Sequence, residues 1–376
     1  MQHPTTRREF LASSAAAAAL PLTRHVAPVL PRAPLKILIL GGTGYLGPET
    51  VEVALAHKHE VTLFNRGRTN PQLFPDVEKL HGDRDPKKGD GLKALEGTRK
   101  WDVVIDNSGY VPRIVGASAE LLKERAQHYV FVSTCSVYED VPGKVLDESA
   151  KLMTAPDPTT EEVRRHYGAL KALCEAAAEK AFPGRTSNVR PGLIVGPGDP
   201  TDRYTYWPVR VARGGEVLCP GKAEAKVQFV DVRDLAEFLV RVIEERVYGV
   251  FNAVSDPSFA TFGKVVESCK RASGSDATFT WVDEAWLLEK KVRPWSELPL
   301  WIPGKDACWF SPAAAVAKGL RFRGLEDTAK ATLAWFEKAR KDKPMTAPLA
   351  AAKEKELLAA WHERAKATPA TGEKKG

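Results

Sequence analysis

A tyrosine and a lysine four residues apart are the side chains of this sequence best suited to acid–base chemistry. Tyr167 and Lys171 fall in a helix-compatible run, residues 161–182. Because residues four apart share one face of a helix, the phenol and the ammonium can point into the same cleft. A cationic neighbour stabilises a phenolate, so we expect Lys171 to lower the pKa of Tyr167 from about 10 toward neutral pH. Tyr167 is then a candidate general acid or base for a substrate hydroxyl.

A glycine-rich segment, residues 35–47, has the pattern of a dinucleotide-binding turn. An aliphatic run leads into Gly41, Gly44 and Gly47, and a helix-compatible run follows at residues 48–56. Gly41 permits a tight turn, Gly44 lets backbone N–H groups approach a pyrophosphate, and Gly47 lets the helix lie close to the strand. The positive end of the helix favours the phosphates. The alternative is a turn that binds no ligand. Further cofactor contacts are expected from Thr43, Tyr45 and Leu46.

The loop after the second expected strand bears on the choice of cofactor. Many NAD sites have an acidic residue there, whereas NADP sites use arginine against the extra phosphate. Here Asn65 ends the strand, and Arg66 and Arg68 offer charged forks for a phosphate. We therefore predict NADP, with NAD as the alternative cofactor and a solvated basic loop as the alternative role of the arginines.

The elements that position these residues alternate between buried strands and helices, which predicts an α/β fold. The expected strands are residues 35–40, 60–65, 79–83, 101–106 and 128–133. The pattern predicts a Rossmann, doubly wound parallel sheet with a smaller C-terminal substrate lobe. A dinucleotide passes the carboxyl ends of such strands. The cofactor contacts expected there and beyond are Asp83, facing the adenine, with Ser108, Tyr167, Lys171 and Pro191.

Together, five motifs resemble the extended short-chain dehydrogenase/reductase family, the NAD(P)-dependent epimerase/dehydratase type, from Leu35 to about Phe336. They are residues 41–47 (GGTGYLG), 133–138 (STCSVY), 167–171 (YGALK), 190–197 (RPGLIVGP) and 228–236 (QFVDVRDLA). The resemblance implies that Thr134 hydrogen-bonds the reacting oxygen and that Tyr167 is the acid or base. It gives Lys171 the role of holding the nicotinamide ribose.

Two departures from the family pattern concern the substrate. The 4,6-dehydratases of the family have an acidic pair after the threonine, where this chain has Cys135 and Ser136, so dehydration is disfavoured. Nucleotide-sugar epimerases commonly have an arginine for the substrate diphosphate where this chain has Val227, beside Lys226. We therefore do not expect a nucleotide-linked sugar.

Residues 1–34 differ in composition from the rest and resemble a twin-arginine export signal. Arg7 and Arg8 precede Phe10 and Leu11, and a short apolar run and several prolines follow. The alternative is an Ala/Pro-rich leader that contains two arginines by chance. Four arginines and one glutamate give this segment a net charge of +3, so the formal +7 falls to +4 without it. We expect an exported protein, periplasmic or extracellular, with the twin-arginine machinery as a partner and no membrane contact after processing.

The remaining charge is modest for a nucleic-acid binder, and no nucleic-acid partner is expected. The five cysteines are scattered, without a Cys-x-x-Cys pair or a histidine cluster, so no metal site is expected. Residues 35–190 are assigned to the cofactor domain and residues 191–340 to the substrate lobe, which interleaves with the sheet. Residues 341–376 are expected to form a charged helical tail, with a surface helix at 354–366. Lobe aromatics that could stack on a sugar, or simply pack, are Tyr204, Tyr206, Trp207, Trp295 and Trp301.

The sequence thus predicts an NADP(H)-dependent oxidoreductase or epimerase that acts on a small-molecule secondary alcohol or its ketone. The expected substrate is a carbohydrate without a nucleotide. A second hypothesis is a binding protein on the same scaffold, because the fold also resembles chloroplast stem-loop RNA-binding relatives. The sequence does not indicate the oligomeric state.

Overall fold

The structure is a computed structural model that describes residues 33–304, 308–345 and 349–367. Arg7 and Arg8 lie outside the described residues, so the expected export signal stays a prediction. Among the described residues, none of the helices has the length and apolar content needed to cross a lipid bilayer.

A parallel sheet of seven strands carries the cofactor domain, in the order β12-β7-β5-β4-β1-β2-β3. Buried aliphatic and aromatic side chains fill both of its faces, as parallel sheets covered by helices require. Its strands are β1 (Lys36–Leu40), β2 (Glu60–Asn65), β3 (Glu78–His81), β4 (Val103–Asp106), β5 (His128–Val132), β7 (Thr186–Pro191) and β12 (Gly249–Ala253).

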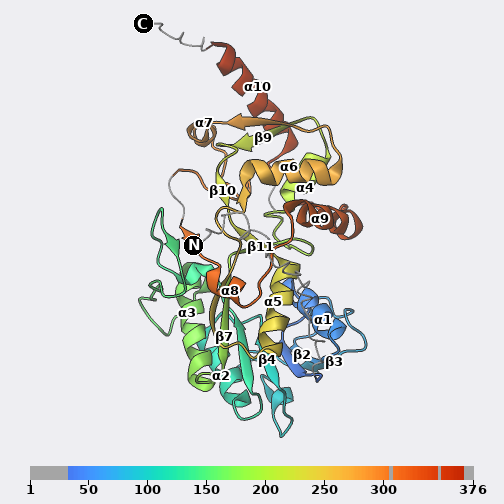
Figure 1. The fold of residues 1–376 in the computed structure, drawn as a ribbon, viewed down its shortest axis with the longest axis vertical. Coiled ribbons are helices and arrows are strands. Elements are labelled where there is room, and N and C mark those ends of the chain that lie inside the picture. Colours follow the sequence, from blue (N-terminus) through green and yellow to red (C-terminus); the bar gives the residue numbers. More distant parts are fainter. Residues whose placement is uncertain (1–32, 305–307, 346–348, 368–376) are drawn as a thin grey trace, which may run out of the picture. The chain divides into compact units, whose positions relative to one another are not determined.

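Helices cover both faces of this sheet (Figure 1). On one face, α1 (Leu46–Ala56) and α5 (Val232–Glu244) pack against β1, with Ile37 and Ile39 beneath them. On the other face, α2 (Pro112–Leu122) and α3 (Val163–Ala181) cover Leu38 and Leu40. The architecture is the predicted Rossmann-like α/β fold.

The strand order reverses at β1. From β1 the chain builds β2 and β3 on one side and then returns to build β4, β5, β7 and β12 on the other. Ligands of doubly wound sheets bind at the carboxyl ends of the strands where the order reverses. The residues that follow β1, β2 and β4 are therefore placed to form a binding site.

Many of the remaining elements form a second core, and the chain passes to and from it. After β7 the chain enters this core, returns to the sheet as α5 and β12, and then leaves again. The elements outside the sheet layers are η1 (Lys93–Leu95), η2 (Cys135–Val137), β6 (Val145–Leu146), β8 (Leu193–Val195), α4 (Tyr206–Ala212), β9 (Glu216–Pro220), β10 (Lys226–Val227), β11 (Phe229–Asp231), β13 (Ala260–Thr261), α6 (Phe262–Ser273), β14 (Thr278–Val282), α7 (Glu284–Glu289), β15 (Trp309–Phe310), α8 (Ala313–Ala317), α9 (Leu325–Ala339) and α10 (Ala351–Ala367).

Helix α10 is present where the sequence predicted a surface helix, and most of its residues are exposed, but one of its faces is buried in the second core. Leu357 and Leu358 are each less than 10% exposed. Glu354, 4% exposed, accepts from the Arg210 side chain at 2.7 Å and from the backbone N–H of Leu218 at 3.1 Å. A buried carboxylate needs such partners to offset its lost hydration. Charged residues dominate the composition of this helix, so its apolar stripe was not recognised in the sequence.

Candidate active site

A cavity of about 1290 Å³ opens at the carboxyl ends of the sheet strands and extends to the second core. Every residue predicted to be catalytic or to bind the cofactor lines it. These residues are Gly41, Thr43, Gly44, Tyr45, Leu46, Gly47, Asn65, Arg66, Arg68, Asp83, Ser108, Thr134, Tyr167, Lys171 and Pro191.

The glycine turn has the geometry that its three glycines predicted. Gly41 has φ = +120°, and a Cβ there would lie 2.2 Å from Oδ1 of Asn107, so only glycine fits. A Cβ on Gly47 would lie within 3 Å of the backbone of Gly42, which shows how closely α1 approaches the turn. A Cβ on Gly44 would meet no protein atom within 4 Å. The backbone at Gly44 therefore faces open space at the start of an 11-residue helix, where a phosphate is favoured.

Asn65 joins the glycine turn to the basic loop. Its side-chain amide donates to the carbonyl of Gly41 at 3.2 Å and accepts from the N–H of Gly67 at 2.8 Å. Arg66 and Arg68 flank Gly67, and both are exposed. Neither guanidinium forms a salt bridge with any residue that the structure describes, so both can bind an anion in the cavity.

Thr134 and Tyr167 meet because a glycine lets their elements approach. A Cβ on Gly168 would lie 2.0 Å from the carbonyl oxygen of Ser136, so α3 packs directly on the η2 turn that Thr134 begins. The Thr134 hydroxyl accepts from the N–H of Ser136 at 3.1 Å, which leaves its proton free to donate. The Thr134 hydroxyl lies close enough to the Tyr167 phenol to lower the pKa of that phenol. An oxygen bound between them could receive two hydrogen bonds.

The expected effect of Lys171 on Tyr167 was wrong. Burial is the largest influence and raises the pKa of Tyr167 above 10, although 37% of the residue is exposed. The nearby Thr134 hydroxyl and the charge of Arg203 lower this pKa, but they do not outweigh burial. A raised pKa keeps the phenol protonated at neutral pH, which suits a general acid.

Lys171 instead turns its ammonium toward backbone carbonyls. Nζ donates to the oxygen of Gly109 at 2.8 Å and of Val132 at 2.6 Å, and it lies 4.1 Å from the centre of the Phe131 ring. Burial lowers the pKa of this amine to about 8. Lys171 thus ties the ends of β4 and β5 to α3, and we infer that the third ammonium N–H is its remaining donor.

An ion pair that the sequence did not reveal supports the same strand ends. Arg84 binds Asp106 through two hydrogen bonds, of 2.6 and 2.8 Å, and donates to the Ser108 hydroxyl at 3.1 Å. Ser108 in turn donates to the carbonyl of Leu40 at 2.9 Å. Asp106 is fully buried; burial acts to raise its pKa, but Arg84 and a hydrogen bond from Tyr129 leave the pKa lowered. Arg84 directly follows Asp83 in the sequence, but nothing there indicated its partner.

The lobe aromatics divide into two groups. Tyr204, Tyr206 and Trp207 are at most 3% exposed and belong to the second core. Trp295 and Trp301 line the cavity, with Trp295 37% exposed. Trp295 and Leu300 both have a left-handed backbone, with φ of +61° and +67°, which is strained for bulky residues and is often found at binding sites.

The positions at which the sequence departs from the family pattern also line the cavity; they are Cys135, Ser136, Lys226 and Val227. Cys135 accordingly brings no negative charge to it, because burial raises the pKa of its thiol far above the usual range. Its Sγ donates to the carbonyl of Arg190 at 3.2 Å. Val227 is buried and Lys226 exposed, on a two-residue strand at the cavity wall.

The cavity fits a dinucleotide such as NAD(P). It offers the open backbone at Gly44, the unpaired cations Arg66 and Arg68, and two buried hydroxyls, those of Tyr45 and Ser133. Among the described residues, neither hydroxyl has a hydrogen-bond partner. Buried polar groups without partners are uncommon, and a polar ligand in the cavity would supply them.

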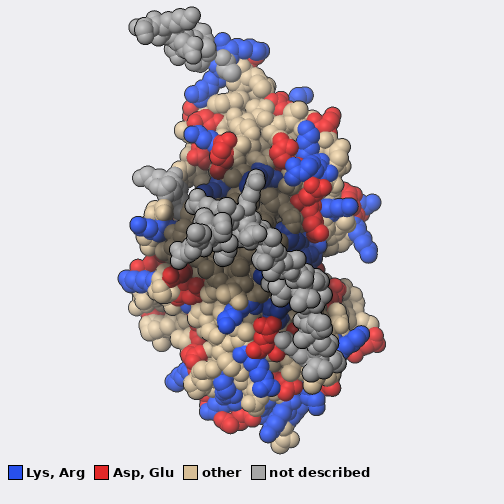
Figure 2. Space-filling view, viewed as in Figure 1, with Lys and Arg blue, Asp and Glu red and all other residues tan. Residues whose placement is uncertain are grey.

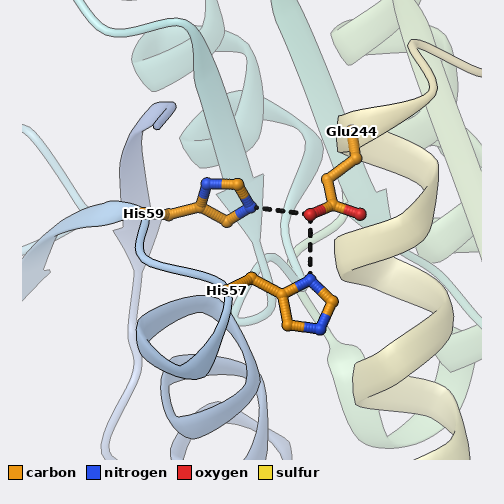
Figure 3. Close-up of side chains that lie close together, drawn as sticks. All are labelled: His57, His59 and Glu244. Atoms are coloured by element: carbon orange, nitrogen blue, oxygen red, sulfur yellow. Dashed lines mark hydrogen bonds and ion pairs between the residues drawn. The ribbon is translucent and has the colours of Figure 1, made fainter. Parts of the chain in front are cut away.

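A second cluster of polar side chains lies away from this cavity, at the C-terminal ends of α1 and α5 (Figure 3). His57 and His59 both contact the carboxylate of Glu244, at 2.9 and 3.1 Å. These groups could hold a metal ion, and the sequence gave no sign that they meet. However, Nδ1 of His59 accepts from the N–H of Leu35 at 3.2 Å, so in the neutral ring the proton sits on Nε2, which donates to Glu244. A metal ligand needs a lone pair on that nitrogen, so the arrangement fits a hydrogen-bonded link better than a metal site.

Comparison with known proteins supports the resemblance. The model of the NAD dependent epimerase/dehydratase family matches residues 90–253. Over 254 residues the chain is 28% identical to the chloroplast stem-loop binding protein of 41 kDa b from Arabidopsis thaliana, covering 64% of this chain and 63% of that protein. Over 224 residues it is 28% identical to the 2-alkyl-3-oxoalkanoate reductase of Stenotrophomonas maltophilia, covering 54% of this chain and 64% of the reductase. The chain thus spans just under two thirds of the length of both relatives.

Solved structures resemble this fold over most of the chain. The enzyme WbmH of Bordetella bronchiseptica, in complex with NAD+, gives a TM-score of 0.61 at 16% identity and covers 82% of this chain and 99% of its own. UDP-glucose 4-epimerase of Thermus thermophilus, in complex with NAD, gives 0.57 at 19% identity, with 81% and 99% covered. At these identities the likeness shows the Rossmann-like fold. With the family match and the relatives, it supports an NAD-dependent enzyme of the epimerase/dehydratase type.

Proposed function

We propose that the protein is an NAD(P)-dependent oxidoreductase or epimerase that acts on a secondary alcohol or its ketone. The observation that carries this proposal is that the hydroxyls of Thr134 and Tyr167 lie near each other and share one cavity with Lys171 and the glycine turn. The substrate classes that we propose are a carbohydrate without a nucleotide and an oxo acid. The second class is supported by the relative named 2-alkyl-3-oxoalkanoate reductase.

The chain's own residues would share the work as follows. Bound NAD(P) supplies the hydride donor or acceptor. Thr134 and Tyr167 hold the substrate oxygen, and Tyr167 gives its proton to a ketone or takes one from an alcohol. Lys171 fixes the strand ends around the site and can reach a ribose hydroxyl through its remaining N–H. Arg66 and Arg68 favour NADP, because a 2′-phosphate would pair with guanidinium groups that otherwise face solvent.

Native mass spectrometry of the purified protein tests the proposal. A mass increase equal to NADP or NAD identifies the cofactor directly. Protein without nucleotide is next titrated with each cofactor. Failure of both to bind would reject the proposal, whatever the substrate.

We propose further that the protein is exported through the twin-arginine route, on the basis of Arg7, Arg8 and the short apolar run after them. Replacing both arginines by lysine should keep the protein inside the cell, as seen by fractionation. Unchanged export of that variant would contradict the signal assignment.

Export would constrain the reaction cycle, because free NADP is scarce outside the cytoplasm. We therefore propose that the cofactor is retained and restored in each cycle, either by epimerisation or by a second substrate that reoxidises it. Deuterium on the reacting carbon should stay with the product of an epimerase and pass to a second molecule in a transhydrogenating enzyme. Rapid exchange of added NADP would contradict retention.

RNA binding is the second candidate, because one relative is named as a stem-loop binding protein. On the face drawn in Figure 2, basic side chains are interspersed with acidic ones, which is unlike the continuous basic surface of many nucleic-acid binders. RNA binding depends steeply on salt, because counterions are released, whereas binding in the cavity should not. A stem-loop RNA titrated at two salt concentrations distinguishes these candidates.

A further inference from the structure

A turn in the cavity wall holds the guanidinium of Arg203 in a fixed position. The turn is built on Asp199, which is fully buried and accepts from the N–H of Thr201 at 2.9 Å and from its hydroxyl at 2.5 Å. The same hydroxyl oxygen accepts from Nε of Arg203 at 2.8 Å. One edge of the guanidinium is thereby fixed by Thr201, and the two Nη groups remain as donors.

The outer edge of Arg203 has no protein partner among the described residues, and the side chain lines the cavity. Neighbouring guanidinium groups differ: Arg84 binds Asp106 at 2.6 Å, and Arg190 binds Glu175 at 2.6 Å. An arginine held by one edge, with its fork directed to a partly enclosed space, is suited to bind a planar anion through two hydrogen bonds.

The position of Arg203 relates it to the reacting groups. Its charge acts on the phenols of both Tyr167 and Tyr45, and in each case it lowers the pKa. Tyr167 is the proposed acid, and Tyr45 belongs to the glycine turn. Gly198, which begins the Arg203 turn, places its backbone against the Tyr45 ring, where a Cβ would lie 3.3 Å from a ring carbon. Arg203 thus lines the same cavity as the cofactor turn and the proposed acid and lies within electrostatic range of both.

We propose that Arg203 binds a carboxylate of the substrate, so that the enzyme selects a hydroxy acid or an oxo acid over the corresponding neutral ester. This inference rests on the proposed function and specifies the substrate class of the same site. Lys226, which is exposed at the cavity wall and forms no ion pair with a described residue, adds positive charge on the substrate side and favours the same class.

Arg203 can bind either of two anions in this cavity: a carboxylate of the substrate or the pyrophosphate of the cofactor. The two are distinguished by which affinity depends on Arg203. A substrate carboxylate predicts that Arg203 affects acids and not esters. A pyrophosphate contact predicts that Arg203 affects NADP and NAD equally, and acids no more than esters.

Isothermal titration calorimetry of the NADP-loaded protein tests the proposal. The probes are sodium 3-oxooctanoate with its methyl ester and sodium glucuronate with its methyl ester. We expect the wild-type protein to bind at least one acid more tightly than its ester. Arg203→Gln should reduce that preference by roughly 10- to 100-fold, because a charged hydrogen-bonded pair is lost. Arg203→Lys keeps the charge but loses the two-pronged hydrogen bonding of the guanidinium, so its preference for the acid should lie between those of the wild type and Arg203→Gln.

Arg213→Gln is the matched control, because Arg213 carries the same charge ten residues further on, is exposed, and does not line the cavity. It should leave every affinity unchanged. The inference is overturned if the wild type prefers neither acid to its ester, or if Arg203→Gln weakens acid and ester equally. Cofactor binding is measured first in the same protein. A wild type that binds NADP but shows no acid preference rejects only this inference, whereas one that binds no nucleotide rejects the proposed function.

Discussion

At the scale of single residues, the proposed chemistry depends on the phenol of Tyr167 and on the groups that surround it. The raised pKa keeps the proton on the oxygen, next to a threonine hydroxyl that can bind the same substrate atom. In the part of the chain that the structure describes, this side chain makes no salt bridge, and the Thr134 hydroxyl lies near its own hydroxyl. Removing its hydroxyl should therefore affect turnover much more than folding.

Tyr167→Phe should lower turnover by at least ~10²-fold, the usual effect of a positioned acid or base. The melting temperature and the affinity for NADP should stay close to those of the wild type, because the ring remains. Steady-state kinetics, a thermal melt and a cofactor titration measure the three quantities. Wild-type turnover in this variant would mean that another group transfers the proton.

Arg66 and Arg68 should set the preference for NADP. Replacing both by alanine should weaken NADP by on the order of 1.5 to 3 kcal/mol for each lost charged hydrogen bond and leave NAD almost unchanged. Arg213→Ala controls for the loss of surface charge. Equal weakening of both cofactors would show that the arginines do not bind the 2′-phosphate.

The sequence allowed the positions of Tyr167 and Lys171 to be predicted, but not their environment. The spacing of four indicates a shared helix face and says nothing of the carbonyls of Gly109 and Val132, which come from other strand ends. The pKa of Tyr167 was predicted in the wrong direction for the same reason. The roles of Arg84 and Arg203 were not predicted, because they depend on contacts between residues far apart in the sequence. Arg84 has the carboxylate of Asp106 beside it, whereas Arg203 has no carboxylate partner among the described residues.

At the scale of elements, the contact between α3 and the η2 turn brings the acid to the threonine. The helix contains a break at His166, where φ is −123°, and regular geometry resumes at Tyr167. Gly168 follows and lies against the carbonyl of Ser136. The close packing of α3 on the η2 turn thus sets the position of Tyr167 relative to Thr134.

Gly168→Ala should destabilise the protein by about 1–3 kcal/mol, because the added Cβ overlaps the Ser136 carbonyl. It should also displace Tyr167 from Thr134 and lower turnover by up to ~10²-fold. Urea unfolding and kinetics measure these effects.

Gly116→Ala, in α2, is the matched control. A Cβ there would lie 3.7 Å from the Cβ of Ala177, an ordinary contact, so stability should be unchanged or rise by up to about 1 kcal/mol. If both glycine variants behave alike, the close packing at Gly168 is not what positions the acid.

Five strands of the central sheet, β1 to β5, were predicted, most of them as short apolar runs that follow a turn signal; β7 and β12, whose sequences TSNVRP and GVFNA are more polar, were not. The smaller strand pairs were not predicted either. The pair β8 and β11 has three residues on each strand and joins segments more than thirty residues apart, and such pairing leaves little periodicity in the sequence. The apolar stripe of α10 was hidden by its lysines and glutamates.

At the scale of the whole molecule, buried histidines link stability to pH. His128 is 2% exposed, and burial lowers the pKa of its imidazole to about 4, with a contribution from Arg246. Its Nε2 lies 2.6 Å from the hydroxyl of Ser187, which donates to the carbonyl of Val247 at 2.5 Å. The ring is therefore neutral in the folded protein.

Stability should fall as the pH is lowered from about 6.5 to about 4, because in this range the unfolded chain binds a proton that folded His128 does not. The full effect is about 3 kcal/mol, on the scale of 1.36 kcal/mol for each pKa unit. His128→Gln should reduce the slope, whereas the same change at exposed His81 should leave it. Urea unfolding at a series of pH values measures the slope. An unchanged slope in His128→Gln would assign the pH dependence to other groups, among them His59, whose pKa burial also lowers.

The packing of α10 in the second core determines when that core can be completed during synthesis of the chain. The partners of this helix, Arg210 and Leu218, leave the ribosome more than a hundred residues before Glu354 does. Until then the Arg210 guanidinium lacks its carboxylate, and the part of the core that Leu357 and Leu358 cover stays exposed. The core behind the substrate half of the cavity can therefore close only after synthesis of α10, when the sheet strands have long been complete.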